Sequence, residues 1–377
     1  MANPYSGIPD HQFWRRAMSR QESFRLDPVT ATGFSIAVTD RVATAGSCFA
    51  QHISRSLAGI GFNYYVPEQP APDLPAAEAT RRNFGVFSCR YGNLYTARQL
   101  LQLFQEAFGQ RSPVETAWRR PDGRFVDPYR PQIEPDGFET EEEVAAARAA
   151  HLAHVRAMFE TTDLFIFTLG LTEGWRSKRD GAVFPLAPGV AGGSYDHGRH
   201  EFVNFSVHEI EQDMQTFMHA LRRVNRRCRV VLTVSPVPLI ATYEPRHVLV
   251  STTYSKSVLR VVAEEISRSF RDVDYFPSYE IITTHANRGS YYEDDLREVN
   301  GLGVAHAMRI FLRHYPAAAQ PAPAAAAAVP PTAPRPAEAM AAAAGAGAAG
   351  AGDPVAALLA GPAGIVCDEE AIDHIRA

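Results

Sequence analysis

Hydrophobic positions along the chain fall into short apolar runs that alternate with longer amphipathic stretches. Residues 165–167, Phe-Ile-Phe, are apolar at successive positions, as in a strand that is covered on both faces. Strands that alternate with helices favour right-handed crossovers and a parallel sheet, so the pattern predicts a three-layer α/β sandwich. The expected strands are 41–45, 62–66, 164–169, 229–235 and 273–276, and the expected helices are 49–58, 97–108, 141–160, 207–226, 254–270 and 301–315.

Two segments do not follow this alternation, residues 110–138 and 175–205, which are rich in Gly, Pro, Asp and aromatic residues. Both follow elements that should end near the carboxyl edge of the sheet. They are interpreted as lids over a site or as plain connecting loops.

The end of the chain has a different composition. Residues 316–352 are almost entirely Ala, Pro and Gly, which predicts a disordered linker because such a stretch buries too little varied apolar surface. Residues 353–377 are expected to be a frayed tail or a short docking helix, with the folded domain over residues 1–315. A tail that tethers the domain to an assembly is a further hypothesis.

Composition narrows the class of protein. The chain has 377 residues and a formal net charge of −5, which gives no electrostatic reason to expect nucleic-acid binding. Its four cysteines match neither zinc spacing nor a disulfide framework, which predicts reduced thiols, a cytoplasmic location and no metal site. No stretch offers the roughly 18 apolar residues of a membrane span. The oligomeric state stays open.

The segment at residues 42–50 carries the strongest chemical signal. A strand-like run stops at Gly46-Ser47 and a helical pattern follows at once, so Ser47 should project from the carboxyl end of a strand. The amides that follow begin a helix and suit an anion or an oxyanion. Ser47 is therefore a candidate nucleophile, although a serine here could equally cap the helix. Cys48 is a weaker candidate, because it should point into the packing behind the turn.

Two other segments should reach the same edge of the sheet. After the third expected strand, Gly170 permits a close backbone approach, Thr172 offers a hydroxyl donor, and Glu173 could position a neighbour. The alternative is an ordinary turn that ends the strand. Before the last helix, Asp295 and Glu298 could face the site or could serve the helix dipole.

Together these segments resemble the GSCFA family, whose name is spelled by residues 46–50. The resemblance runs from about residue 3 to residue 315 and places the chain near the SGNH/GDSL hydrolases, which implies a mostly parallel, flavodoxin-like sheet in an α/β/α sandwich. Other family-like stretches are 13–14, 84–87, 233–237 and 254–260.

The resemblance also implies roles for single residues. Ser47 is implied as the nucleophile. Its own amide, Gly85 and Thr172 are implied as oxyanion donors. Gly170 and Glu173 belong to the same motif as Thr172. Glu298 stands where the superfamily has its catalytic histidine, and Asp295 would orient that base. Free glutamate is about two pKa units less basic than histidine, so His306 and His285 are alternative bases.

The implied function is a serine-dependent ester hydrolase or O-acyltransferase that acts on acyl esters, including O-acetyl esters of carbohydrates, without a cofactor or metal. The alternative is a binding module that keeps a pocket for a carbohydrate or acyl ligand but has lost the reaction with its histidine. Lys256 could bind an anionic group or could be an exposed helix lysine.

Overall fold

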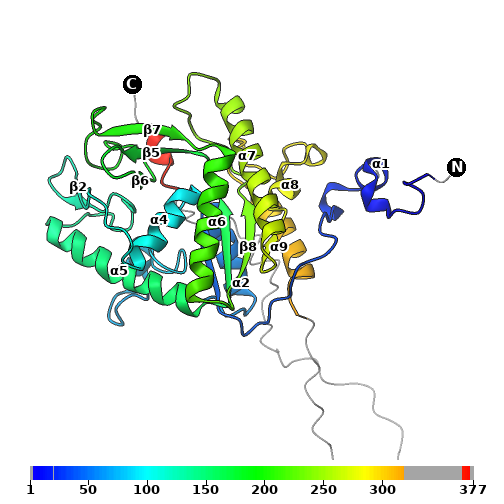
Figure 1. Ribbon diagram of the computed structural model, residues 1–377, viewed down its shortest axis with the longest axis horizontal. Helices are drawn as coiled ribbons and strands as arrows, with labels where there is room; N and C mark the ends of the chain where they lie inside the picture. Colours follow the sequence, from blue (N-terminus) through cyan, green and yellow to red (C-terminus); the bar gives the residue numbers. More distant parts are fainter. Residues whose placement is uncertain (1–2, 20, 318–366, 374–377) are drawn as a thin grey trace, which may run out of the picture.

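A four-stranded parallel sheet forms the centre of the molecule (Figure 1). The structure is a computed structural model that describes residues 3–19, 21–317 and 367–373. In spatial order, the strands are β1 (Val42–Gly46), β4 (Leu164–Leu169), β8 (Arg229–Val234) and β9 (Val273–Tyr275). Four of the five expected strands therefore form as predicted.

The fifth expected strand, at residues 62–66, is reduced to a single parallel bridge between Val42 and Tyr64 at the outer edge of β1. Two backbone hydrogen bonds hold it, from Val42 N to Asn63 O at 3.0 Å and from Tyr65 N to Val42 O at 2.8 Å. Pro67 has no amide to continue the ladder. With this bridge included, the order is the flavodoxin-like 2-1-3-4-5, and the strand order reverses beside β1.

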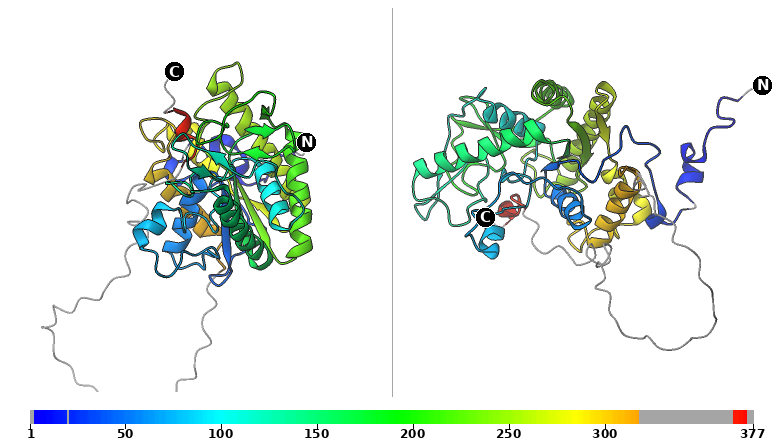
Figure 2. Two further views of the ribbon diagram at one scale, coloured as in Figure 1. Left: turned by 90° about the vertical axis from the view of Figure 1, so that its left-hand side faces the viewer. Right: turned by 90° about the horizontal axis from the view of Figure 1, so that it is seen from below.

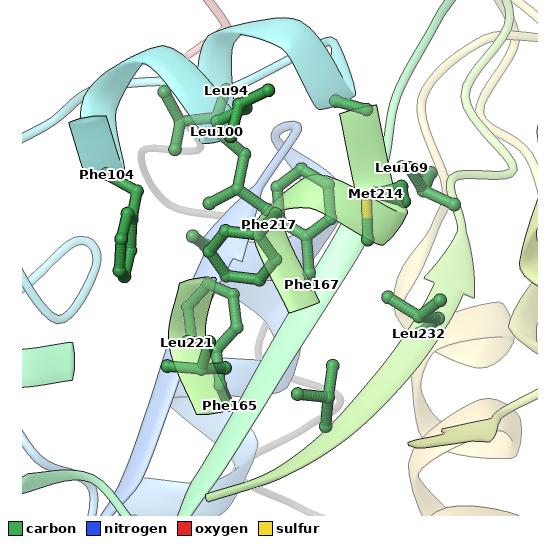
Figure 3. Close-up of a cluster of buried hydrophobic side chains, with 14 of the residues drawn as sticks. Leu94, Leu100, Phe104, Phe165, Phe167, Leu169, Met214, Phe217, Leu221 and Leu232 are labelled. Atoms are coloured by element: carbon green, nitrogen blue, oxygen red, sulfur yellow. The ribbon is translucent and has the colours of Figure 1, made fainter. Parts of the chain in front are cut away.

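Helices cover both faces of the sheet and produce the predicted three layers. Alternate residues of each strand point to opposite sides: Phe165 and Phe167 of β4 join one apolar cluster, whereas Leu164 and Ile166 join the other. Figure 3 shows Phe165 and Phe167 packed against Phe217. The first face is covered by α4 (Ala97–Ala107), α5 (Glu141–Thr161), α6 (Val207–Val224) and α7 (Val248–Ser269), and the second by α2 (Phe49–Gly59), α8 (Ser278–Thr283) and α9 (Gly301–His314).

Side-chain caps define where several helices begin. Capping boxes open α4, through Thr96 and Gln99, and α6, through Ser206 and Glu209. The prediction for α7 was wrong at its start, because the helix begins at Val248 rather than at residue 254. The ring of His247 accepts the Leu249 amide there, and histidine is not one of the usual N-cap residues.

The two segments that broke the alternation are not plain loops. The first contains a hairpin of β2 (Trp118–Arg119) and β3 (Phe125–Val126). The second contains most of an antiparallel sheet in the order β6-β5-β7, formed by β5 (Glu173–Ser177), β6 (Val183–Phe184) and β7 (His200–Asn204). Trp175 pairs with both Phe184 and Phe202 in this sheet, so aromatic cross-strand pairs support it.

The remaining elements are short. The helix α1 (Trp14–Ala17) lies on an arm at one side of the molecule (Figure 2), and α3 (Ala76–Arg81) precedes the loop that leads to α4. The expected linker lies outside the described residues from residue 318 onward. Within the expected tail, α11 (Glu370–Asp373) is a short helix beside β5 and β7 (Figure 1). Among the described residues, no helix is long and apolar enough to cross a membrane.

Candidate functional site

Ser47 lies in the turn between β1 and α2, at the carboxyl edge of the sheet. The turn requires Gly46, whose φ is +135°, because a Cβ there would lie 2.4 Å from the Thr168 carbonyl oxygen. Ser47 is 3 % exposed, and its Oγ has no hydrogen-bond partner among the residues that the structure describes. The cap position of α2 is Cys48, without a side-chain cap bond, so Ser47 does not act as the helix cap.

The amide of Ser47 is not free to receive an oxyanion in this structure, because it donates to the Thr168 carbonyl at 3.2 Å. The resemblance had implied that amide as a donor. The next two amides, of Cys48 and Phe49, belong to the first turn of α2, where a helix offers no carbonyl acceptor. These two amides are therefore the donors that suit developing negative charge beside Ser47.

The turn after β4 approaches Ser47 closely, as expected from Gly170. A Cβ on Gly170 would lie 3.1 Å from the Ser47 Cβ and 2.9 Å from the Tyr95 carbonyl oxygen. That carbonyl accepts from the amides of Gly170 and Leu171, at 3.1 and 3.0 Å, and the Leu94 amide donates to the Gly46 carbonyl at 2.9 Å. The loop before α4 is thus part of the site.

The side chains of Thr172 and Glu173 are hydrogen-bonded to residues outside the Ser47 turn. The Thr172 hydroxyl donates to Asn204 Oδ1 at 2.7 Å, so its only proton is engaged. The Glu173 carboxylate accepts from the Thr242 hydroxyl at 2.7 Å and from the Tyr243 amide at 3.3 Å, while burial raises the pKa of Glu173. Both residues anchor the small antiparallel sheet to the main one.

Asp295 and Glu298 are exposed and form a turn before α9. One Asp295 carboxylate oxygen accepts from the amides of Arg297 and Glu298, at 2.9 and 3.0 Å. Burial and the nearby Asp295 charge raise the pKa of Glu298. Leu296 takes a left-handed backbone with φ of +54°, and Arg297 is less exposed than Asp295 and Glu298, with 12 % of its side chain exposed. The structure therefore brings Arg297, rather than Glu298, to the interior.

The alternative bases and the predicted glycine donor lie elsewhere. Both ring nitrogens of His306 are engaged, Nδ1 with the Tyr291 hydroxyl and Nε2 with the Leu26 carbonyl, each at 2.8 Å. The ring of His285 stacks on Trp14 with centroids 5.6 Å apart. Gly85 is exposed and faces open space. The described structure does not bring these three residues to Ser47.

Lys256 is the titratable side chain that the structure adds at this edge. It is 2 % exposed, and its Nζ donates to the Gly170 carbonyl at 2.6 Å. Burial lowers the pKa of Lys256 to about 8, although Glu369 and Cys48 act in the opposite direction. The sequence carried a usable signal, because Lys256 lies on the same helix face as Leu259 and Ala263, both buried.

The site is completed from the far end of the chain. Arg297 Nη2 donates to Glu369 Oε2 at 2.8 Å, and the Glu369 amide donates to the Tyr95 hydroxyl at 3.3 Å. The adjacent Asp368 is buried, which raises its pKa to about 6, and it accepts from the Asn93 amide at 3.4 Å. Sequence reasoning missed this segment, because residues 353–377 show no motif that ties them to Ser47.

A cavity of about 270 Å³ adjoins the site. Its wall includes Leu171 from the turn after β4, the aromatic side chains of Trp175, Phe202 and Tyr243, and Glu369. The rings of Trp175 and Tyr243 meet edge to face with centroids 4.8 Å apart. Among the described residues, no group of three His, Cys, Asp or Glu side chains could hold a metal ion.

These features define a flavodoxin-like α/β protein with a buried serine at the carboxyl end of its first strand. A family model described as the GSCFA family matches residues 41–311, more than half of the chain, and the chain belongs to this family. The match includes Ser47, Lys256 and Arg297 and ends before Glu369. Comparisons with curated proteins and with solved structures gave no match.

Proposed function

We propose that this protein is a serine-dependent acyl ester hydrolase or O-acyltransferase with Ser47 as its nucleophile. The observation that carries the proposal is a buried Ser47 hydroxyl, without a partner among the described residues, at the start of α2. The turn at Gly170, to which the Lys256 amine is bonded, lies directly against this serine. The resemblance to SGNH hydrolases supports the same chemistry.

The residues divide the reaction between them. Ser47 Oγ forms a bond to the acyl carbon, and the amides of Cys48 and Phe49 stabilise the oxyanion. The hydroxyl proton goes to neutral Lys256, whose amine is bonded to the Gly170 carbonyl in this structure and has to turn from it to come within hydrogen-bond reach of Ser47 Oγ. Lys256 then gives its proton to the leaving alcohol as the ester bond breaks. Water or an acceptor hydroxyl attacks the acyl-serine, loses its proton to Lys256, and releases Ser47, which takes the proton back.

The lowered pKa of Lys256, about 8, is what makes an amine usable as this base. About a tenth of such amines are neutral at pH 7, compared with a negligible fraction at an ordinary lysine pKa. Lys256 therefore takes the place that the sequence hypothesis gave to Glu298, whose side chain is exposed. The aromatic walls of the adjoining cavity offer surfaces for an acyl chain or a sugar ring.

Replacing the nucleophile tests the proposal. We expect Ser47→Ala to lower kcat/KM on acetyl esters, including p-nitrophenyl acetate and acetylated sugars, by about 10³-fold or more, because no acyl-serine can form. Ser257→Ala, an exposed serine on α7, is the matched control and should keep full activity. Equal turnover by Ser47→Ala and the wild type would remove Ser47 from the mechanism.

The base is tested separately through the pH profile. The wild-type rate should rise with pH, reach half of its maximum near pH 8 and level off above that, following the pKa of Lys256. Lys256→Met should lose this limb, and Lys256→Arg should not restore it, because a guanidinium stays charged. A profile that is unchanged in both variants would exclude Lys256 as the base.

A binding module is the second candidate function, and one observation favours it. No titratable side chain among the described residues lies within hydrogen-bond reach of Ser47 Oγ. Retained ligand binding together with no Ser47-dependent turnover would decide for this alternative.

A further inference from the structure

The C-terminal segment Cys367–Glu369 is buried against the candidate site, although residues 318–366 lie between it and the rest of the described chain. Glu369 is 8 % exposed and Asp368 is 2 % exposed, which is unusual for carboxylates near the end of a chain. A hydrogen bond with the Cys48 thiol, together with burial, raises the pKa of Cys367 far above its ordinary value. The segment therefore lies directly over the residue that follows Ser47.

The pocket that receives Glu369 contains two cationic side chains, the partly buried Arg297 and the buried Lys256. Arg297 Nη2 bonds Glu369 Oε2 at 2.8 Å, and the side chains of Arg297 and Glu369 are 12 % and 11 % exposed, respectively. Lys256 is 2 % exposed. Burial raises the pKa of Glu369, whereas the charges of Arg297 and Lys256 act to lower it. The charge of the adjacent Asp368 acts with burial to raise the pKa of Glu369.

The pocket also has donor capacity that Glu369 does not use. Arg297 Nε is buried without a hydrogen-bond partner among the described residues. Lys256 has three protons, and the bond to the Gly170 carbonyl uses one of them. A guanidinium with a free Nε suits a carboxylate that binds through both of its oxygens.

The C-terminal segment that carries Glu369 also reaches the adjoining cavity. Ile372, three residues after Glu369 and on the same side of this short helical turn, lines the cavity together with Leu171 and Trp175. The segment thus presents a carboxylate to the cations and an aliphatic group to the aromatic wall. A ligand that replaces this segment would therefore carry a carboxylate and a neighbouring apolar group.

We propose that Arg297, with Lys256 near it, forms a subsite for a carboxylate beside Ser47, and that Glu369 occupies this subsite while the C-terminal segment is seated. The natural ligand is then an acidic molecule with an apolar or ring-shaped neighbouring part, and the segment competes with it. That the ligand is also an ester rests on the proposed function; the binding of a carboxylate does not.

Chemical rescue in the full chain tests the subsite. Glu369→Ala removes a carboxymethyl group whose shape acetate restores, so saturating acetate should raise the Tm of this variant by about 3 °C or more over chloride at equal ionic strength. The wild type should respond much less, because its subsite is filled. Neutral acetamide should have no such effect, and adding Arg297→Met should abolish the response to acetate. Equal responses of the wild type and Glu369→Ala, or equal effects of acetate and acetamide, would overturn the proposal.

The unaltered chain provides a second measurement in case Glu369→Ala folds poorly. Diamide accepts two electrons and two protons as it converts the Cys48 and Cys367 thiols to a disulfide, and this requires a seated segment. We expect glutarate to slow formation of this disulfide at least threefold by displacing the segment, whereas glutaramide should not. The disulfide is counted by mass spectrometry of tryptic peptides. Failure to form it, or a rate that glutarate does not change, would contradict the proposal.

Two esters separate this inference from the proposed function. Glu369→Ala should hydrolyse mono-p-nitrophenyl glutarate with at least tenfold higher kcat/KM than p-nitrophenyl butyrate. An acetate response without turnover of either ester would keep the subsite and reject the esterase. Turnover of both esters without discrimination, and without an acetate response, would keep the esterase and reject the subsite.

Discussion

Two clusters of charged side chains in the interior of this protein both contain arginine and a carboxylate but differ in how their charges are paired. Beside α5, Asp127 accepts from Arg130 Nε at 2.7 Å and from Arg148 Nη1 at 3.1 Å, and Arg148 also bonds Glu106. These residues come from one contiguous part of the chain. Beside Ser47, Arg297 bonds Glu369 of the C-terminal segment, and the charge of Lys256 lowers the pKa of the same carboxylate without a direct ion pair.

The contrast separates a structural role from a chemical one. Burial alone would raise the pKa of Asp127, but Arg148 and Arg130 outweigh it and hold that pKa at about 2, so its charge is fixed at neutral pH. For Lys256, burial outweighs the nearby opposite charges, and its pKa falls to about 8. A buried amine that can lose its proton near neutral pH, next to a serine, is the arrangement expected of a site that reacts.

Removing the centre of the structural cluster should have the largest effect on stability. Asp127→Asn keeps the shape but leaves Arg130 and Arg148 without their shared counter-charge, and we expect a loss of about 3–5 kcal/mol in the free energy of unfolding. Urea titration followed by circular dichroism measures it. Glu160→Gln, at the exposed pair with Arg156, is the control and should cost less than 1 kcal/mol. A similar small loss for both variants would show that the buried cluster is not structural.

The turn that presents Ser47 gives the next largest effect. Gly46→Ala should cost about 3 kcal/mol, because φ is +135° and the new Cβ would collide with the Thr168 carbonyl. Gly61→Ala is the matched control, since Gly61 also has a positive φ, +83°, but faces open space. It should cost about 1 kcal/mol. Equal losses in thermal or urea unfolding would mean that close packing does not determine the turn.

The titration of Lys256 should give the smallest effect, and it depends on pH. The folded pKa is about 8 and the unfolded value 10.5, so between these values the unfolded state binds more protons and stability rises with pH. Relative to Lys256→Met, the wild type should gain about 2–3 kcal/mol in unfolding free energy between pH 7 and pH 10. Arg148→Met should show no such trend against the wild type. A constant difference for Lys256→Met would refute the lowered pKa.

Much of the fold follows from local patterns. Apolar residues at successive positions in β4 and β8 predicted buried parallel strands. Polar side chains cap the starts of four of the predicted helices, at Thr96, Thr140, Ser206 and Asn300. The exceptions have physical causes. Pro67 stops the expected second strand, and the unusual histidine cap moves the start of α7. The antiparallel sheet around Trp175 needs partners far apart in the sequence, which local patterns do not reveal.

The site was predicted only in part, because side-chain direction decides it. Ser47 and Gly170 meet as expected, since each follows directly from the end of a strand. In the turn before α9, a left-handed Leu296 accompanies a partly buried Arg297 and an exposed Glu298, and sequence spacing alone does not show this choice. Glu369 could not have been assigned at all, because no spacing connects it to Arg297.

The central claim is that Ser47 is an activated nucleophile, and labelling with a fluorophosphonate probe tests it most directly. The full chain and its Glu369→Ala variant should both be labelled, the variant faster because its segment seats less firmly, with the adduct located at Ser47 by mass spectrometry. Ser47→Ala should not be labelled, whereas Ser257→Ala should react normally. A Ser47 that stays unlabelled in both the wild type and Glu369→Ala, at pH 7 and at pH 9, would contradict the claim.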